Sequence, residues 1–423
     1  MLKEFRIKNF KSIKEEQTFT MEACAKNEVS EYPEHVIEIG GERLLKVASM
    51  YGPNGGGKTN LIKAFNAFAA MVINNMIVND SIKDENYFPS VFLKNNNTEF
   101  TWFFIRDNYE IGYKLVVDMN NLHQIINTAN NNVFYIIDYK IISEEFVSRL
   151  LSEKDFKTIY IRDNNGLVKS DVITNIDLIK EGTLLNPNNT FIKYFCSTFS
   201  SDKSVEAMPI FEAYNEINSY SVLKREVAIF NYLKADVDHL IPYLDKAKEF
   251  LNQLDFRIDK LLFKDYAPGA YVLYVRRKTR DGNYTEMPLQ NESKGTIKAI
   301  NIILDVLSNR GGQLFIADDF DSFLHPKIIK VIIDLFTSKE NINKQLIINS
   351  HDMVNMNNRV FRRDEIWFAY RDDNYSTVYK PLSSIVDYKG NMVRKDAVYG
   401  KQYLEGRYGA DPFIEKGLNW NND

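Results

Sequence analysis

The residues with the clearest chemical meaning lie in a glycine-rich segment, Gly52 to Thr59, with the sequence GPNGGGKT. It fits the pattern G-x-x-x-x-G-K-[ST], in which glycines let consecutive backbone N–H groups turn toward phosphate oxygens. In such a P-loop, Lys58 reaches the β- and γ-phosphates and the Thr59 hydroxyl ligates Mg²⁺. A pattern this short also occurs in ordinary glycine-rich surface turns, so its meaning depends on the elements around it.

Both flanks of this segment have the required character. The run 44–51 is short and mostly apolar and predicts a buried strand, and apolar residues recur at helical spacing from Leu61 to Val72. A helix that begins at the loop points its positive end at the phosphates. The sequence therefore predicts a site for ATP and Mg²⁺. The residues expected to contact the nucleotide here are Gly52, Asn54, Gly55, Gly56, Gly57, Lys58, Thr59 and Asn60.

A second group of candidate residues comes much later in the chain. The apolar run 313–317 ends in two carboxylates, Asp318 and Asp319. Asp318 is placed to hold Mg²⁺ together with Thr59, and Asp319 is placed to orient an attacking water. Two aspartates that only cap a strand-to-helix turn would explain this pair equally well, so the neighbouring motifs matter.

Three neighbouring motifs favour the catalytic interpretation. The run 318–326 (DDFDSFLHP) aligns with the Walker B and D-loop pattern of ABC-type ATPases, and the strand-like run 345–348 leads into His351, a candidate γ-phosphate contact. Upstream, ESKGT at 292–296 opens an apolar helix, with Ser293 and Gly295 matching the ABC signature. The order of P-loop, long gap, signature, Walker B, D-loop and histidine is typical of the ABC class.

This arrangement also predicts an assembly. A signature loop cannot reach the P-loop of its own chain, so the helix N-terminus near Ser293 is expected to face the γ-phosphate held by a second protomer. We therefore expect a homodimer, or a higher homo-oligomer, with ATP between its heads.

The remaining chain predicts an α/β fold: an ABC-type head, similar to those of SMC and Rad50, with a mixed β-sheet lobe and a helical insertion. Residues 1–142 form the N-terminal ATPase lobe, 143–265 the helical insertion, and 266–423 the C-terminal ATPase lobe. The expected strands are 2–10, 99–105, 112–118, 133–142 and 271–277; the expected helices are 144–151, 190–199, 209–218 and a longer one from 240 to 254. The spacing of that last helix continues to Leu261, which leaves a short coiled coil open beside a helix packed on its own domain.

Bulk properties narrow the class of protein. The 423 residues carry a formal charge of −4, so no overall basic excess indicates nucleic acid. Two cysteines, Cys24 and Cys196, are too few for a disulfide framework or a zinc site. The first ten residues lack the apolar block of a signal peptide, and no apolar run is long enough to span a membrane. We expect a cytoplasmic protein with no membrane partner.

With these motifs identified, the sequence resembles the stand-alone ABC/SMC-like ATPases of the AAA_15 group. Their relatives include the OLD ATPases and the phage-defence ATPases of abortive-infection, RloA and PARIS (AriA-type) systems. The motifs that carry the resemblance are IKNFKSI at 7–13, the P-loop, LDFRID at 254–259, ESKGT, DDFDSFLHP, NSHD at 349–352 and YLEGRYGADP at 403–412. Two features depart from the pattern: Asp319 replaces the usual Glu, which predicts slow turnover, and no Q-loop glutamine is evident between Phe88 and Glu99.

The resemblance implies an anti-phage defence role in which this ATPase senses a trigger, such as a phage component, and controls a separate effector. The sequence offers no acidic cluster, apart from the Walker B pair, for metal-dependent cleavage, so the effector is expected to be another polypeptide. The resemblance implies that this effector is a Toprim-like nuclease. The alternative is a DNA-repair or DNA-end-binding ATPase similar to RecF and Rad50. The basic clusters 3–11 and 276–280 leave that alternative open. A transporter subunit has little support, because a membrane domain and a Q-loop are both missing from the sequence.

Overall fold

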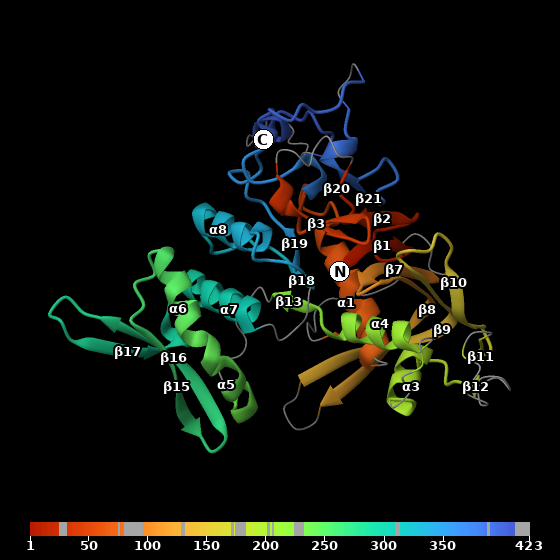
Figure 1. Ribbon diagram of the computed structural model, residues 1–423, viewed down its shortest axis with the longest axis horizontal. Helices are drawn as coiled ribbons and strands as arrows, with labels where there is room; N and C mark the ends of the chain where they lie inside the picture. Colours follow the sequence, from red (N-terminus) through yellow and green to blue (C-terminus); the bar gives the residue numbers. More distant parts are fainter. Residues whose placement is uncertain are drawn as a thin grey trace, which may run out of the picture.

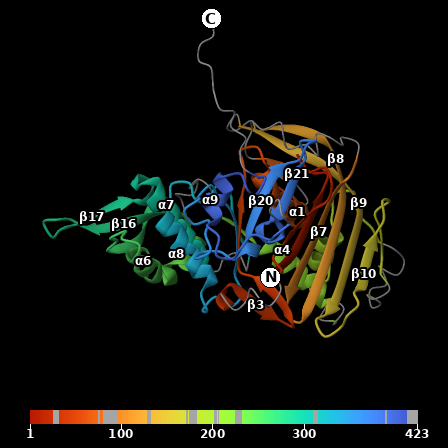
Figure 2. The ribbon, with the colours of Figure 1, turned by 90° about the horizontal axis from the view of Figure 1, so that it is seen from above.

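The computed structural model describes residues 1–24, 32–74, 77–79, 96–127, 132–170, 173, 183–200, 204, 207–223, 232–308, 314–386 and 390–410. Its elements form three regions: a central sheet, a large antiparallel sheet on one side, and a small lobe on the other (Figure 1, Figure 2).

The central sheet is where the predicted motifs meet. Its strand order is β13 (Ser221–Leu223), β18 (Leu314–Ala317), β19 (Gln345–Asn349), β5 (Val47–Tyr51), β20 (Ile366–Arg371) and β21 (Thr377–Pro381). The first five strands are parallel, and β21 returns antiparallel to β20. The carboxyl ends of parallel strands share one edge, which is where α/β sheets bind ligands. The P-loop follows β5, and the two aspartates follow β18.

The large sheet is antiparallel throughout its described pairings. Its order is β12 (Thr183–Leu184), β11 (Leu167–Lys169), β10 (Lys157–Arg162), β9 (Asn132–Leu150), β8 (Tyr109–Asn127), β7 (Thr98–Arg106), β1 (Leu2–Lys8) and β2 (Gln17–Thr20), with β6 (Ile77–Asn79) paired to β9. Helices α3 (Phe191–Thr198) and α4 (Met208–Asn218) contact one another and α1 (Lys58–Asn74), the helix that follows the P-loop.

Helix α1 is buried between the two sheets. Phe65 stacks on Phe5 of β1 with ring centroids 4.1 Å apart, and Phe68 lies 5.3 Å from the ring of Trp102 in β7. Each buried phenylalanine contributes about 1.5–3 kcal/mol by leaving water. Because the same helix begins at Lys58, this packing fixes the position of the phosphate-binding loop.

The small lobe carries the predicted signature. It contains β14 (Tyr232–Leu233), β16 (Ala270–Lys278), β15 (Lys260–Ala267) and β17 (Tyr284–Pro288), with α5 (Lys234–Leu240), α6 (Leu244–Gln253) and α7 (Lys294–Ser308). Buried residues of α6, β16 and α7 share one core with the outer face of the central sheet. The other elements are the hairpin β3 (Val36–Ile39) and β4 (Glu42–Leu45), and helices α8 (Pro326–Thr337) and α9 (Tyr399–Leu404).

Several expected elements are confirmed: the first strand, the hairpin 99–118, the helices near 190–199 and 209–218, and the strand 271–277. The run 44–51 is two strands, β4 and β5, separated at Lys46. The Lys46 side chain is buried and its ammonium donates to the Ser338 carbonyl at 2.8 Å, which places a polar anchor between the strands.

The helix predicted at 144–151 is wrong, because residues 144–150 complete β9. Burial alternates along the strand, with Glu144, Phe146 and Ser148 buried. Glu144 is charged, so the sequence does not reveal that it occupies a buried position of this alternating pattern. Its carboxylate can be buried because it accepts hydrogen bonds from Tyr113 and Tyr160, both at 2.8 Å.

The longer helix expected from 240 to 254 is confirmed over most of its length as α6, whose Leu244, Ala247 and Leu251 are buried in the core, but the continuation of its spacing to Leu261 is not helical. Helix α6 ends at Gln253, and Asp255 and Arg257 adopt left-handed backbone angles (φ 62° and 51°) that no α-helix continues through. Leu261 belongs to β15, so its heptad spacing is coincidental. The segment 143–265 therefore contains strands β10 to β13 as well as helices.

Candidate nucleotide site

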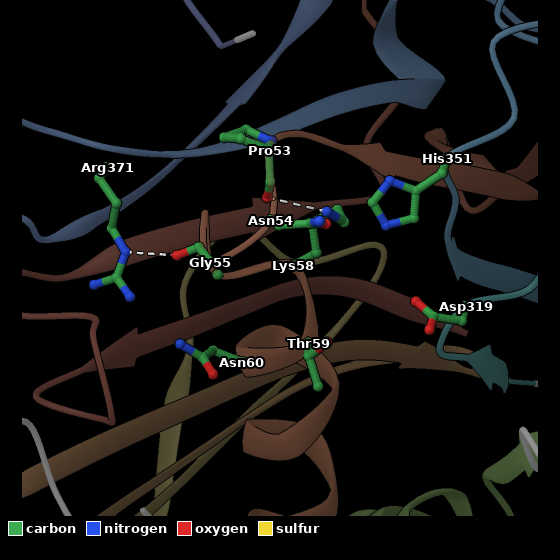
Figure 3. Close-up of a pocket in the computed structure, with 10 residues that line it drawn as sticks. Pro53, Asn54, Gly55, Lys58, Thr59, Asn60, Asp319, His351 and Arg371 are labelled. Carbon is green, nitrogen blue, oxygen red and sulfur yellow. Dashed lines mark hydrogen bonds between the residues drawn. The ribbon is translucent and has the colours of Figure 1, made fainter. Parts of the chain in front are cut away.

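The predicted residues converge on a cavity of about 270 Å³ at the carboxyl edge of the central sheet (Figure 3). The residues that line it are Pro53, Asn54, Gly55, Gly57, Lys58, Thr59, Asn60, Asp319, His351 and Arg371. Eight of these were expected from the sequence. Gly52 and Gly56 lie in the same loop, and their carbonyls take part in the contacts that hold it.

The P-loop lysine is buried within its own loop. The Lys58 ammonium donates to the carbonyls of Gly52 at 2.7 Å and Pro53 at 3.1 Å. Burial lowers the pKa of Lys58, although the negative charges of Asp319 and Asp318 act in the opposite direction. A triphosphate would supply the compensating charge that this ammonium lacks.

The two predicted metal-binding residues are adjacent. The Thr59 hydroxyl donates to Asp318 Oδ1 at 3.1 Å, and the Asn349 amide donates to the same oxygen at 2.8 Å. These are hard oxygen donors beside the phosphate loop, which is what Mg²⁺ takes when phosphates complete its coordination. The residues present therefore fit a Mg²⁺ ion.

Asp319 and His351 lie together on the opposite side of the cavity from Arg371 (Figure 3). Asp319 has a left-handed backbone (φ 44°), a conformation that costs an aspartate energy and is typical of functional positions. The His351 N–H donates to Asp321 Oδ1 at 3.1 Å, which ties the histidine segment to the D-loop.

Three side chains of the β20–β21 hairpin hold the P-loop from behind, and the sequence analysis missed all three. Arg371 Nε donates to the Gly55 carbonyl at 2.7 Å, the Thr377 hydroxyl to Gly56 at 3.1 Å, and the Tyr379 hydroxyl to Gly57 at 2.9 Å. Burial lowers the pKa of Arg371. No local motif marks these residues, because their partners are hundreds of positions away.

The hairpin also explains two glycines of the loop. A Cβ on Gly52 would lie 2.0 Å from the Ala369 carbonyl oxygen, and one on Gly57 would lie 2.2 Å from Thr377 Oγ1. Both glycines have positive φ angles, 144° and 109°. Only glycine allows the hairpin to approach this closely.

Asn60 connects the loop to the first segment of the chain. Its amide donates to Ser12 Oγ at 2.6 Å, and Ser12 Oγ is 2.7 Å from Thr377 Oγ1. A chain of polar contacts thus runs from the IKNFKSI segment through Thr377 to Gly56.

The signature residues Ser293 and Gly295 do not line this cavity. Ser293 is exposed at the start of α7, where its Oγ accepts the Thr296 N–H at 3.2 Å. A Cβ on Gly295 would lie 2.5 Å from the Phe323 carbonyl oxygen. Gly295 therefore packs on the D-loop, and replacing it would disturb that loop as well as any phosphate contact.

Lys298, one turn into α7, is a further residue that the sequence analysis missed. Its buried ammonium donates to the carbonyls of Asp319 at 2.9 Å and Ser322 at 3.1 Å, and to the Ser322 hydroxyl at 2.8 Å. The signature helix is thereby bonded to the backbone of the candidate base.

Some predicted features lie outside the described residues: the Q-loop search region up to residue 95, and Asp411 and Pro412 of the closing motif. Within the described residues, no group of three or more His, Cys, Asp or Glu side chains could hold a metal ion. Among the same residues, no helix is long and apolar enough to cross a membrane.

Comparisons with solved structures return SMC heads. The SMC head domain from Thermotoga maritima and an SMC head bound to the C-winged helix domain of ScpA each share 12% identity, at a TM-score of 0.40. Each match covers 90% of this chain and 98% of the other. No curated protein matches significantly.

A family of AAA domains matches residues 47–357, which include the P-loop, the signature segment, both aspartates and His351. The α/β class expected from the sequence agrees with this match and with the parallel central sheet. The chain belongs to this family, described as AAA domain, putative AbiEii toxin, Type IV TA system.

Proposed function

We propose that the chain is a cytoplasmic ABC-type ATPase that binds and hydrolyses ATP with Mg²⁺. One observation carries the proposal: Thr59, which lines the cavity beside Lys58, donates from its hydroxyl to Asp318, a residue 259 positions later in the chain. An isolated glycine-rich turn would not bring a Walker B carboxylate to its hydroxyl.

Each side chain then has a distinct task. Lys58 leaves its two loop carbonyls and neutralises the β- and γ-phosphates, while Thr59 and Asp318 hold the metal ion, which withdraws charge from the phosphates when bound. Asp319 orients a water for attack on the γ-phosphate, and His351 donates to that phosphate. Asp319 is one methylene shorter than the usual Glu, so we expect turnover of about 1 s⁻¹ or less.

We further propose that two protomers complete each site head to tail. The exposed N-terminus of α7 at Ser293 is outside the cavity of its own chain, yet a helix N-terminus is suited to bind an anion. A second protomer would present its Ser293 and Gly295 to the γ-phosphate. In this proposal, the two protomers therefore close on one another only when ATP is bound.

Cysteine crosslinking tests this geometry. In a chain with Cys24 and Cys196 replaced by Ser and with Asp319→Asn to slow hydrolysis, Asn54→Cys and Lys294→Cys should crosslink between chains with ATP and Mg²⁺. Mixing differently tagged chains, each with one of the two cysteines, distinguishes a crosslink between two chains from a crosslink within one chain. A crosslink confined to one chain, or one that forms equally without ATP, would contradict the head-to-tail dimer. The control pair combines Asn54→Cys with Lys380→Cys, which moves the second cysteine from the signature segment to β21.

We place this ATPase in anti-phage defence, as the sensor and regulator of a separate effector. Its family description names a toxin of a toxin–antitoxin system, and the resemblance to OLD-like, RloA and AriA-type ATPases points to the same setting. A Toprim-like nuclease is the effector we expect. Expressed with its neighbouring genes, the wild-type protein should reduce phage plaque numbers, and Lys58→Ala should not. Equal protection by both would contradict the role.

The DNA-repair alternative gains no specific support. Arg276 pairs with Asp259, with Nε and Oδ2 2.5 Å apart, and Arg277 pairs with Glu292 at 2.9 Å. Two cations of the predicted basic cluster thus already have carboxylate partners.

A further inference from the structure

We propose that Arg371 forms the nucleoside end of the site, by stacking its guanidinium plane on the base of the bound nucleotide. The inference rests on the proposed ATP binding and adds the element that recognises the base.

The position of Arg371 in the cavity is the first support. Asp319 and His351 occupy one side, and Arg371 the other, with Asn60 on the Arg371 side of Thr59 (Figure 3). Since the metal-binding and catalytic groups gather around the γ-phosphate, the nucleoside must extend the other way. That direction leads past Asn60 to Arg371.

The guanidinium is held in a fixed orientation. Nε donates to the Gly55 carbonyl at 2.7 Å, and Nη1 donates to the Tyr375 carbonyl at 2.5 Å. These bonds occupy two edges of the plane and not its faces. A flat, oriented guanidinium is a surface on which nucleic-acid bases stack.

Burial lowers the pKa of the Arg371 guanidinium and the negative charge of Asp372, the next residue in the chain, acts to raise it, but the two make no salt bridge. The Asp372 carboxylate instead accepts the N–H groups of Asn374 at 2.9 Å and Ser376 at 2.7 Å, which build the hairpin turn. Within the described part of the chain, Arg371 has no ion pair with a carboxylate. A guanidinium without an ion pair is favourably placed against the π-system of a base that lies on its face.

This mode of contact predicts a specificity. Stacking grows with ring area and does not depend on the base edge, so purine nucleotides should bind more tightly than pyrimidine nucleotides, and ATP and GTP should differ little.

The test compares ATP with inorganic tripolyphosphate, which offers phosphates without a base. Binding of each, with Mg²⁺, is measured by calorimetry for the wild type, Arg371→Ala, Arg371→Lys and the control Lys380→Ala, an exposed lysine on the same hairpin. Both Arg371 variants disturb the bond to the Gly55 carbonyl, so tripolyphosphate binding should weaken about three- to fivefold, and ATP binding should weaken about tenfold more than that. The preference of ATP over CTP should also shrink, by a smaller factor, because CTP loses a weaker stacking contact.

Each other outcome overturns the inference. Equal losses for ATP and tripolyphosphate would assign Arg371 to support of the P-loop alone, and rescue by Lys would assign it to a phosphate charge. Unchanged ATP binding would remove it from the site. If Arg371→Ala does not fold, Arg371→Lys decides by the same criteria. A wild-type protein that binds tripolyphosphate but shows no preference for ATP contradicts the inference alone, whereas one that binds neither contradicts the proposed function.

Discussion

The phosphate-binding half and the signature half of this molecule are built in contrasting ways. The P-loop is held through its carbonyls by Arg371, Thr377 and Tyr379, which bind the loop from the β20–β21 hairpin. The signature segment is held through side chains, by the Arg277–Glu292 pair and by Lys298, and its helix N-terminus faces outward at Ser293. The first half is a formed receptor for phosphate. The second, in the arrangement we propose, is a surface for a phosphate held by another protomer.

The largest effect expected from this contrast is on Lys58, the buried lysine of the receptor half. Lys58→Ala should lower ATP affinity by roughly 100-fold or more, because no other described ammonium lines the cavity. Calorimetry with ATP and Mg²⁺ measures this, with Lys330→Ala on α8 as the control. Retained affinity would show that the cavity is not the nucleotide site.

Lys298 is the matching buried lysine of the signature half, and its loss should affect a different quantity. Lys298→Met should reduce the hydrolysis rate about tenfold, because Asp319 loses a backbone anchor, while ATP affinity stays within about threefold. Turnover and binding are measured on the same preparation, and Lys330→Met serves as the control. A parallel fall in affinity would mean that the two halves are not separable.

The smallest effect is expected at Thr377, which links Ser12 to the Gly56 carbonyl. Thr377→Val keeps the shape but removes the hydroxyl, so ATP should bind about three- to fivefold more weakly, on the order of one hydrogen bond. Thr377→Ser should restore wild-type affinity. If the Val and Ser variants bind ATP equally well, the contact from the Thr377 hydroxyl does not affect nucleotide binding by the loop.

Sequence could predict the parts of the site that are continuous in the chain. The P-loop, the Asp318–Asp319 pair and the helix after Ser293 each carry their own local pattern, and the parallel sheet then brings the first two together. The hairpin residues could not be found in this way. Thr377 and Tyr379 are ordinary strand residues until β20 lies beside β5, and that pairing has no local signal.

The errors in secondary structure have a common physical cause. Glu144 and Lys46 are charged residues that are buried because tertiary contacts satisfy them, so the polar–apolar pattern around them misleads. At Leu261, the apolar spacing continues through a turn whose left-handed residues carry no glycine to announce it. In each case long-range packing overrode the local preference.

The hairpin that supports the P-loop has a consequence for synthesis of the protein. Arg371 binds a carbonyl 316 residues earlier, so the phosphate loop leaves the ribosome long before the strand that shapes it. A chain interrupted before β20 carries every residue of the P-loop motif, yet lacks the backing that orients it. Nucleotide binding is thereby deferred until nearly the whole polypeptide has been made.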